Sequence, residues 1–192
     1  PTILHVPTAL AAAHRGCHLF IEKPLSHAMT GVDEMVSVVE AHRLIAMVGC
    51  HLRFHPLLRR ARNLLAEQAI GRVIAARLHV GEYLPGWHPG EDYRKGYSAR
   101  RDLGGGVILT LIHELDYAYW FFGDVEDVYA RAGRWSSLEL DVEDTAEILL
   151  HSQAGVTVSV HMDYIQRPPA RTLQVIGEEG TMEWDYYRGR LA

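Results

Sequence analysis

The segment Gly16-Cys17-His18-Leu19-Phe20-Ile21-Glu22-Lys23-Pro24 decides the fold of the first part of the chain. Its short apolar run, residues 18–21, stops sharply at charged residues, which is typical of a parallel strand buried on both faces. An Ala-rich helix is predicted before this strand over residues 8–15, and a helix with one apolar face is predicted after it over residues 30–43. A second apolar run, residues 45–49, follows. The helix–strand–helix–strand pattern predicts half of a doubly wound α/β domain.

The sequence changes character near Pro56, which is well placed to start a helix over residues 56–68. Strand-like segments dominate beyond this helix, and because short turns separate most of them, consecutive strands are expected to pair antiparallel. The predicted strands are residues 72–83, 125–135, 145–151, 156–165, 172–176 and 181–187. An apolar helix is predicted over residues 107–122. The chain is therefore expected to combine an incomplete α/β part, residues 1–55, with an α+β part, residues 56–192, whose open, mostly antiparallel sheet carries helices on one face.

The composition is that of an ordinary globular chain, with 48% hydrophobic and 22% charged residues. The net charge is -5 and no basic stripe is present, which argues against a nucleic-acid partner. No apolar run approaches the roughly 18 residues that a membrane-spanning helix needs. No signal-peptide pattern opens the sequence. We therefore expect a cytoplasmic protein with no membrane partner.

Lys23 is the first candidate for a chemical role. Of the 19 basic residues only Lys23 and Lys95 are lysine, so arginine fills the positions that need only a solvated charge. Lys23 follows a predicted parallel strand, at the edge where open α/β sheets bind ligands, and Pro24 favours an extended backbone before it. Partial desolvation there would lower the pKa of the amine toward neutrality, as acid–base catalysis requires. The alternative is a solvated lysine after a strand.

His113 is the second candidate. It lies in the apolar predicted helix, where an imidazole needs a partner, and Thr110 or Asp116 could provide one on the same helical side. The alternative is a satisfied core histidine. Three glycines, residues 104–106, favour the functional interpretation because they let the backbone approach a ligand closely.

A loop that mixes flat aromatic rings with polar groups is the third candidate. It contains Tyr83, Trp87, Tyr93 and Arg94. Such a mixture suits a sugar, whose apolar face stacks on rings while its hydroxyls form hydrogen bonds. The alternative is a protein–protein contact, because the same residue types are common at interfaces.

No motif predicts a metal site. His51 and His55 have i,i+4 spacing, but Pro56 follows at once, so a helix is expected to start only there. Residues 113–116 lack the second histidine of a zinc protease motif. Metal binding is therefore not expected.

Several motifs, in order along the chain, resemble those of the Gfo/Idh/MocA superfamily (glucose–fructose oxidoreductase, inositol dehydrogenase and rhizopine catabolism proteins). Pro1-Thr2-Ile3-Leu4-His5 is similar to the family's Thr-Pro-Thr-x-x-His turn after the fourth Rossmann strand. Residues 16–26 are similar to its Gly-Lys-His-Val-x-x-Glu-Lys-Pro signature, and Arg53-Phe54-His55-Pro56 to the stretch that joins its two domains. Gly104 to Trp120 is similar to its Gly-Gly-Gly…His…Asp helix, and the aromatic loop to a branch linked with cell-surface sugars.

The resemblance implies an NAD- or NADP-dependent oxidoreductase acting on a hydroxyl of a sugar, sugar derivative or polyol. It implies a C-terminal remnant of a Rossmann domain followed by a substrate-binding and oligomerisation domain. Lys23 and His113 would be catalytic. The residues implied at the cofactor are Thr2, His5, Glu22, Lys23, Pro24 and Arg53. The residues expected at the substrate are Tyr83, Trp87, Tyr93, Arg94 and Thr110. The open sheet face would form a homodimer or homotetramer.

Two departures from the family pattern qualify this interpretation. Thr110 stands where many relatives carry an aspartate one turn before the histidine, and a threonine cannot hold a negative charge. The Gly-x-Gly-x-x-Gly loop that holds the pyrophosphate is absent from this sequence, so an N-terminally truncated relative is expected. The alternative function is therefore a truncated, non-catalytic sugar-binding or oligomerisation module that lacks cofactor binding.

Overall fold

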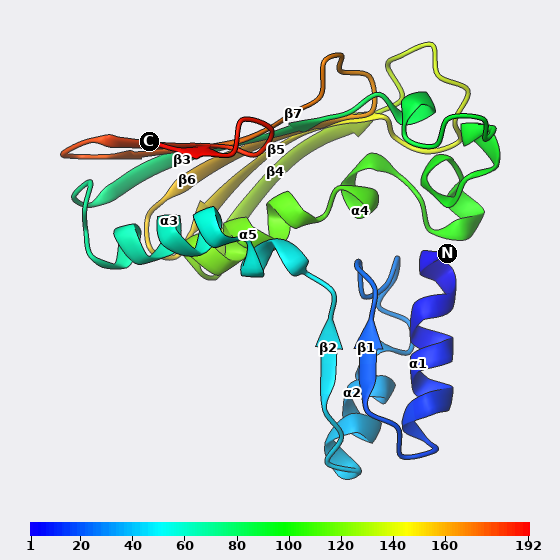
Figure 1. The fold of residues 1–192 in the computed structure, drawn as a ribbon. Coiled ribbons are helices and arrows are strands. Elements are labelled where there is room, and N and C mark those ends of the chain that lie inside the picture. Colours follow the sequence, from blue (N-terminus) through cyan, green and yellow to red (C-terminus); the bar gives the residue numbers. More distant parts are fainter.

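The computed structural model describes residues 1–192 and has two lobes, an α/β lobe and a larger sheet lobe (Figure 1). The α/β lobe contains α1 (His5–Ala13), β1 (Leu19–Ile21), α2 (Val32–Ala41) and β2 (Ala46–Val48). β1 and β2 are parallel, and Leu19 pairs with Ala46. The helix–strand–helix–strand order matches the one predicted. The first helix begins three residues earlier than expected, and the other three elements are shorter than the sequence pattern suggested.

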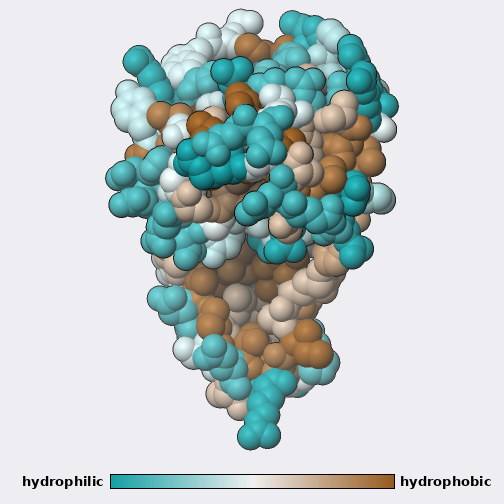
Figure 2. All heavy atoms as spheres, turned by 90° about the vertical axis from the view of Figure 1, so that its left-hand side faces the viewer, coloured by the Kyte–Doolittle hydropathy of each residue, from teal (hydrophilic) through white to brown (hydrophobic).

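Both helices of the α/β lobe pack on one face of its two strands. The small core that they share contains Ala13 of α1, Leu19 and Ile21 of β1, and Met35 of α2. Successive residues of a strand point to opposite faces, so Phe20 faces the other way and is 73% exposed. Figure 2 shows hydrophobic side chains gathered over this narrow lower lobe. One face of the two-stranded sheet is therefore bare.

The sheet lobe is built on seven strands, with helices on one face only (Figure 1). Its elements are α3 (Pro56–Ala66), β3 (Val73–Gly81), α4 (Val107–Thr110), α5 (His113–Phe122), β4 (Val125–Gly133), β5 (Thr145–Ser152), β6 (Thr157–Asp163), β7 (Ala170–Gly177), β8 (Thr181–Asp185) and β9 (Arg190–Leu191). All neighbouring strands are antiparallel except β3 and β6. The mostly antiparallel open sheet with helices on one face is confirmed.

Strand order differs from the expected pairing of consecutive strands at one place. The order is β4-β5-β6-β3-β7-β8-β9, so β3 lies between β6 and β7 and separates them. A short final strand, β9, was not predicted. Since β3 and β7 are far apart in sequence, their pairing depends on packing that no local turn signal encodes.

The single helix predicted over residues 107–122 is in fact two helices, α4 and α5. The helix breaks at Leu111, whose backbone (φ -98°, ψ 29°) leaves the helical region. In a continuous helix the carbonyl of Thr110 would accept an amide four residues later. Here it accepts the amine of Lys23 instead, at 2.7 Å. A tertiary contact therefore takes up the carbonyl where the helix breaks.

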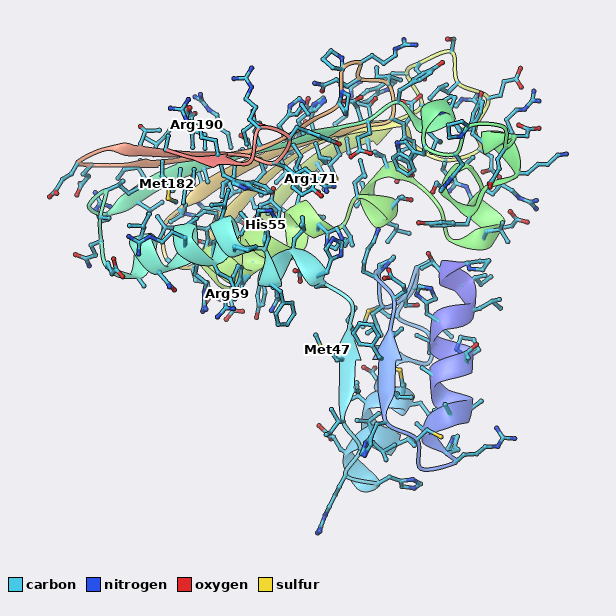
Figure 3. The ribbon with its side chains drawn as sticks, in the orientation of Figure 1. Met47, His55, Arg59, Arg171, Met182 and Arg190 are labelled. Carbon is cyan, nitrogen blue, oxygen red and sulfur yellow. The ribbon has the colours of Figure 1, made fainter.

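The main core lies between the sheet and its helices. It contains 27 buried residues, among them Leu58 of α3, Val80 of β3, Tyr117 of α5 and Trp184 of β8. Figure 3 shows Met182 and Arg171 on the helical side of the sheet and Arg190 on the opposite side. That opposite side is called the open face below. No helix of the structure is long and apolar enough to span a membrane.

Candidate functional site

Lys23 lies where the two lobes meet. The carboxylate of Glu22 accepts a hydrogen bond from the Lys23 backbone N–H at 2.9 Å, immediately after β1. The amine reaches across to the sheet lobe and donates to the Thr110 carbonyl at the end of α4. Burial lowers the pKa of the amine, and the nearby positive charge of Arg171 acts in the same direction, while Glu22 opposes both. Lys23 is thus a half-buried amine and not a freely solvated one.

His113 begins α5 and is 3% exposed. Neither of its ring nitrogens has a hydrogen-bond partner. Burial, followed by the charge of Lys23, lowers the pKa of the imidazole to about 3, so the ring is neutral near neutral pH. Of the two expected partners, Asp116 binds Arg53, and the buried hydroxyl of Thr110 makes no hydrogen bond while its carbonyl binds Lys23. The interpretation of His113 as a satisfied core histidine is therefore wrong.

Three further residues surround His113 and were not singled out from the sequence. The exposed ring of His51 contacts that of His113 edge-on, with centroids 4.4 Å apart. Glu114 is fully buried and pairs with Arg171 of β7, whose Nε lies 2.9 Å from a carboxylate oxygen. Burial outweighs this pairing and raises the pKa of Glu114 to about 7. Arg171 lies between the sheet and α5 (Figure 3).

Sequence signals for these three residues differ. His51 was visible as half of a spaced histidine pair, and Glu114 as the neighbour of His113. Arg171 had no signal, because it stands in an ordinary strand and approaches the site only through the sheet order.

The residues expected at the nicotinamide come together at the same junction. Thr2 is 2% exposed and packs against Gly104, where an added Cβ would lie 2.9 Å from the Thr2 Cβ. The ring of His5 is 2.7 Å from the Pro24 carbonyl oxygen. The opening turn, the Glu-Lys-Pro segment and the triglycine therefore meet around Lys23.

Arg53 holds the other side of the junction. Its guanidinium donates to both carboxylate oxygens of Asp116, at 2.9 and 2.7 Å, and this pairing raises its own pKa. A cavity of about 690 Å³ lies beside it. The lining residues are Pro24, Leu25, Ala46, Met47, Val48, Cys50, Arg53, Phe54, Ile112, Asp116 and Tyr119. They include the immediate neighbours of both Lys23 and His113.

The four loop residues expected at the substrate divide into two pairs. Trp87 and Tyr93 line one cavity of about 140 Å³. Tyr83 does not line it, because its ring stacks beneath the guanidinium of Arg167 at 3.9 Å. Arg94 is exposed and forms ion pairs with Asp92 and Glu139, both at 2.7 Å.

Backbone hydrogen bonds tie this loop to the triglycine. The Ser98 carbonyl accepts the amide of Gly106 at 3.1 Å and the hydroxyl of the buried Tyr164 at 3.3 Å. Tyr164 in turn packs edge-on against Trp87. The small cavity is thus connected, through Gly106 and α4, to the region of Lys23 and His113.

Comparison with known proteins finds one matching family model. Residues 58–183 match the GFO/IDH/MocA C-terminal domain. The 1,5-anhydro-D-fructose reductase of Ensifer adhaerens is 29% identical over 93% of this chain and 53% of its own length. The levoglucosan dehydrogenase of Pseudarthrobacter phenanthrenivorans is 29% identical over 98% of this chain and 54% of its own length. The chain spans about half the length of these curated relatives.

Solved structures share the fold. The WlbA dehydrogenase of Bordetella pertussis, in complex with NADH and UDP-GlcNAcA, superposes with a TM-score of 0.86 at 23% identity. The match covers 96% of this chain and 53% of that protein. The two lobes and their junction therefore correspond to about half of a known architecture.

Proposed function

Because this chain belongs to the GFO/IDH/MocA family, we propose that it forms the catalytic and substrate-binding part of an NAD- or NADP-dependent oxidoreductase. The substrate is a sugar, sugar derivative or polyol that reacts at a hydroxyl-bearing carbon. The names of the two curated relatives, an anhydrofructose reductase and a levoglucosan dehydrogenase, support this substrate class. The NADH held by the Bordetella pertussis dehydrogenase supports a nicotinamide cofactor.

The observation that carries the proposal is the pairing of a desolvated amine with an unpartnered imidazole. Lys23 has a lowered pKa, and both nitrogens of the buried His113 are free. A buried polar group without a partner is costly, and such groups collect at sites that bind ligands. A substrate hydroxyl at the junction would satisfy both side chains.

In the forward reaction, a hydroxyl-bearing carbon becomes a carbonyl by losing a hydride and a proton. A bound nicotinamide supplies the hydride acceptor. Lys23, as the neutral amine, takes the hydroxyl proton, and its lowered pKa favours this form relative to a solvated lysine. Its partner in the free protein is the Thr110 carbonyl, which the substrate oxygen replaces.

His113 acts on the same oxygen. Because the ring is neutral, one nitrogen donates a hydrogen bond and the other accepts one. It therefore orients the hydroxyl and relays the proton between Lys23 and solvent, with the exposed His51 at its edge.

The chain's own residues fit the nicotinamide end of a cofactor. Thr2, His5, Glu22 and Pro24 surround Lys23, and the unpartnered His113 is aligned with them across the junction. Arg53, fixed by Asp116, would hold the far side of the cavity. The pyrophosphate of the cofactor would be held by residues other than the ones named here.

For the substrate, we propose contacts with Trp87 and Tyr93, which share the small cavity. Tyr83 and Arg94 are further proposed contacts, and each would first exchange a present partner, Arg167 or the carboxylates of Asp92 and Glu139. We also propose that the open face forms a homodimer or homotetramer. The exposed Tyr129 and Leu149 on that face, at 72% and 46%, support this proposal.

Lys23→Met tests the lysine assignment, with Lys95→Met as a matched control because it removes the only other lysine, an exposed one. Binding of NADH and NADPH is measured by fluorescence titration, and turnover is followed on a panel of sugars and polyols. Both measurements use a polypeptide that carries a complete dinucleotide-binding domain. We expect Lys23→Met to lose at least about a hundredfold in kcat while cofactor affinity stays within a few-fold.

Near-normal turnover of Lys23→Met would contradict the lysine assignment. Absence of saturable NADH and NADPH binding to this chain up to millimolar concentration would contradict the idea that this chain alone is an active dehydrogenase.

A further inference from the structure

A cluster of metal-binding side chains lies on the open face of the sheet, on the side away from Lys23 and His113. Its members are His79 of β3, His161 and Asp163 of β6, with one ligand atom of each within 4.8 Å of the others. The two imidazole rings stack, with centroids 4.7 Å apart and an interplanar angle of 18°. Nothing in the proposed oxidoreductase reaction uses this cluster.

Sheet register brings the cluster together. β3 and β6 are the one parallel pair of the seven-stranded sheet, and His79 lies directly opposite His161, while Gly81 lies opposite Asp163. A side chain at Gly81 would overlap both the Asp163 Oδ2 and the amide oxygen of Gln166. The missing side chain leaves a hollow into which two oxygens point.

The carboxylate of Asp163 is held in place by the backbone, with one oxygen directed at the cluster. It is 4% exposed, and its Oδ1 accepts the backbone amides of Ile165 and Gln166, both at 2.7 Å. Those bonds fix the group and leave Oδ2 toward the His161 Nε2, 3.0 Å away. Ligand atoms around a tetrahedral Zn²⁺ are about 3.3 Å apart, so this pair already has the required spacing.

An outer carboxylate orients the histidine. Glu147 of β5 accepts from the His161 Nδ1 at 2.6 Å, which directs Nε2 to the cluster. A carboxylate on the far nitrogen of a histidine ligand is the common outer contact of zinc sites.

We propose that His79, His161 and Asp163 bind one Zn²⁺ on the open face, with water as the fourth ligand. Two imidazoles and a carboxylate are a donor set that suits zinc. Binding needs a turn of the half-buried His79 ring away from the Gln166 amide oxygen, 2.6 Å from its Nε2. It also releases to solvent the proton that lies between the His161 Nε2 and the Asp163 Oδ2. His79 also lines a cavity of about 340 Å³ on its other side, toward β7 and β8.

The test is metal titration of the chelator-stripped protein, first with Co²⁺ and then with Zn²⁺ as competitor. We expect one Co²⁺ per chain with the visible absorption of tetrahedral coordination, displaced by Zn²⁺. His79→Gln and His161→Gln should each weaken binding by at least about a hundredfold, and Glu147→Gln by about tenfold. His151→Gln is the matched control, since His151 is a half-buried histidine on the same face outside the cluster.

Absence of saturable metal binding to the wild type, or binding as strong in His79→Gln and His161→Gln as in the wild type, would overturn the proposal. His79→Gln keeps the test decisive if His161→Gln misfolds, because the His79 ring makes a single hydrogen bond, to Gln166. The readout is independent of enzymatic activity, so its outcome does not depend on the oxidoreductase function.

Discussion

Burial sets the charge of the two groups on which the proposed chemistry depends. Lys23 loses water at the junction of the lobes, and His113 is buried so fully that its pKa falls to about 3. The imidazole is therefore neutral near neutral pH. A protonated His113 would face the positive charges of both Lys23 and Arg171 without a hydrogen-bond acceptor.

His113 should make the protein sensitive to acid. Its folded pKa of about 3 lies below the unfolded value of 6.5, so the unfolded state takes up the proton first. Stability is therefore lost as pH falls from 6.5 toward 3. At pH 5 the loss from this group is about 2 kcal/mol relative to pH 7.

Urea unfolding at pH 7 and pH 5 measures this loss. We expect the difference between the two pH values to shrink by about 2 kcal/mol in His113→Gln. It should be unchanged in His42→Gln, which removes an exposed histidine. Equal pH dependence in the wild type and His113→Gln would show that the ring is not held neutral.

At the scale of elements, the triglycine fixes how the loop meets α4. Gly106 immediately precedes α4 and has φ +117°, a conformation that residues with side chains rarely adopt. At Gly105 the reason is space, because an added Cβ would overlap the backbone oxygens of Tyr97 and Arg100. The glycines here allow the backbone of the loop to approach, so their close contact is with protein. A close backbone approach at the triglycine is correctly predicted from the sequence. The predicted approach is to a ligand, whereas in the structure the glycines contact the protein's own backbone.

Gly105→Ala should therefore be strongly destabilising, because the obstructing atoms are backbone and cannot turn away. We expect a loss of more than about 2 kcal/mol in the free energy of unfolding. Gly90→Ala is the matched control in the same loop, where an added Cβ meets nothing within 4 Å. Its cost should be about 1 kcal/mol, from its φ of +91° alone. Similar losses for both variants would rule out the steric explanation.

At the scale of the whole molecule, the chain presents two large surfaces that its own elements do not cover. One is the bare face of β1 and β2, with Phe20 and Met47 exposed. The other is the open face of the seven-stranded sheet, which carries Tyr129 and Leu149 as well as the proposed zinc ligands. The helices of the sheet lobe all lie on one side, so this open face is free for association (Figure 1).

Leu149→Arg tests association through the open face. A charge buried in an interface without a partner is costly, so we expect the dimer affinity to fall by at least about tenfold in sedimentation analysis. Val36→Arg, at an exposed apolar position on α2, should leave association unchanged. A wild-type protein that is monomeric at micromolar concentration would contradict the proposed oligomer.

The sequence by itself determined most of the elements and singled out two residues of the candidate site. Periodicity and turn residues are local properties, so they predicted the α/β start, most of the strands and the side of the sheet that carries helices. The scarcity of lysine singled out Lys23, and the triglycine before an apolar helix singled out His113. These signals lie within a few residues of the groups that they identify.

Only the tertiary structure decided which elements meet. The insertion of β3 between β6 and β7 places His79 opposite His161 and brings Arg171 against Glu114. The break between α4 and α5 frees the Thr110 carbonyl for Lys23. Each of these contacts joins residues more than 50 positions apart. Such pairings are selected by burial of the whole core, a property that no short stretch of sequence carries.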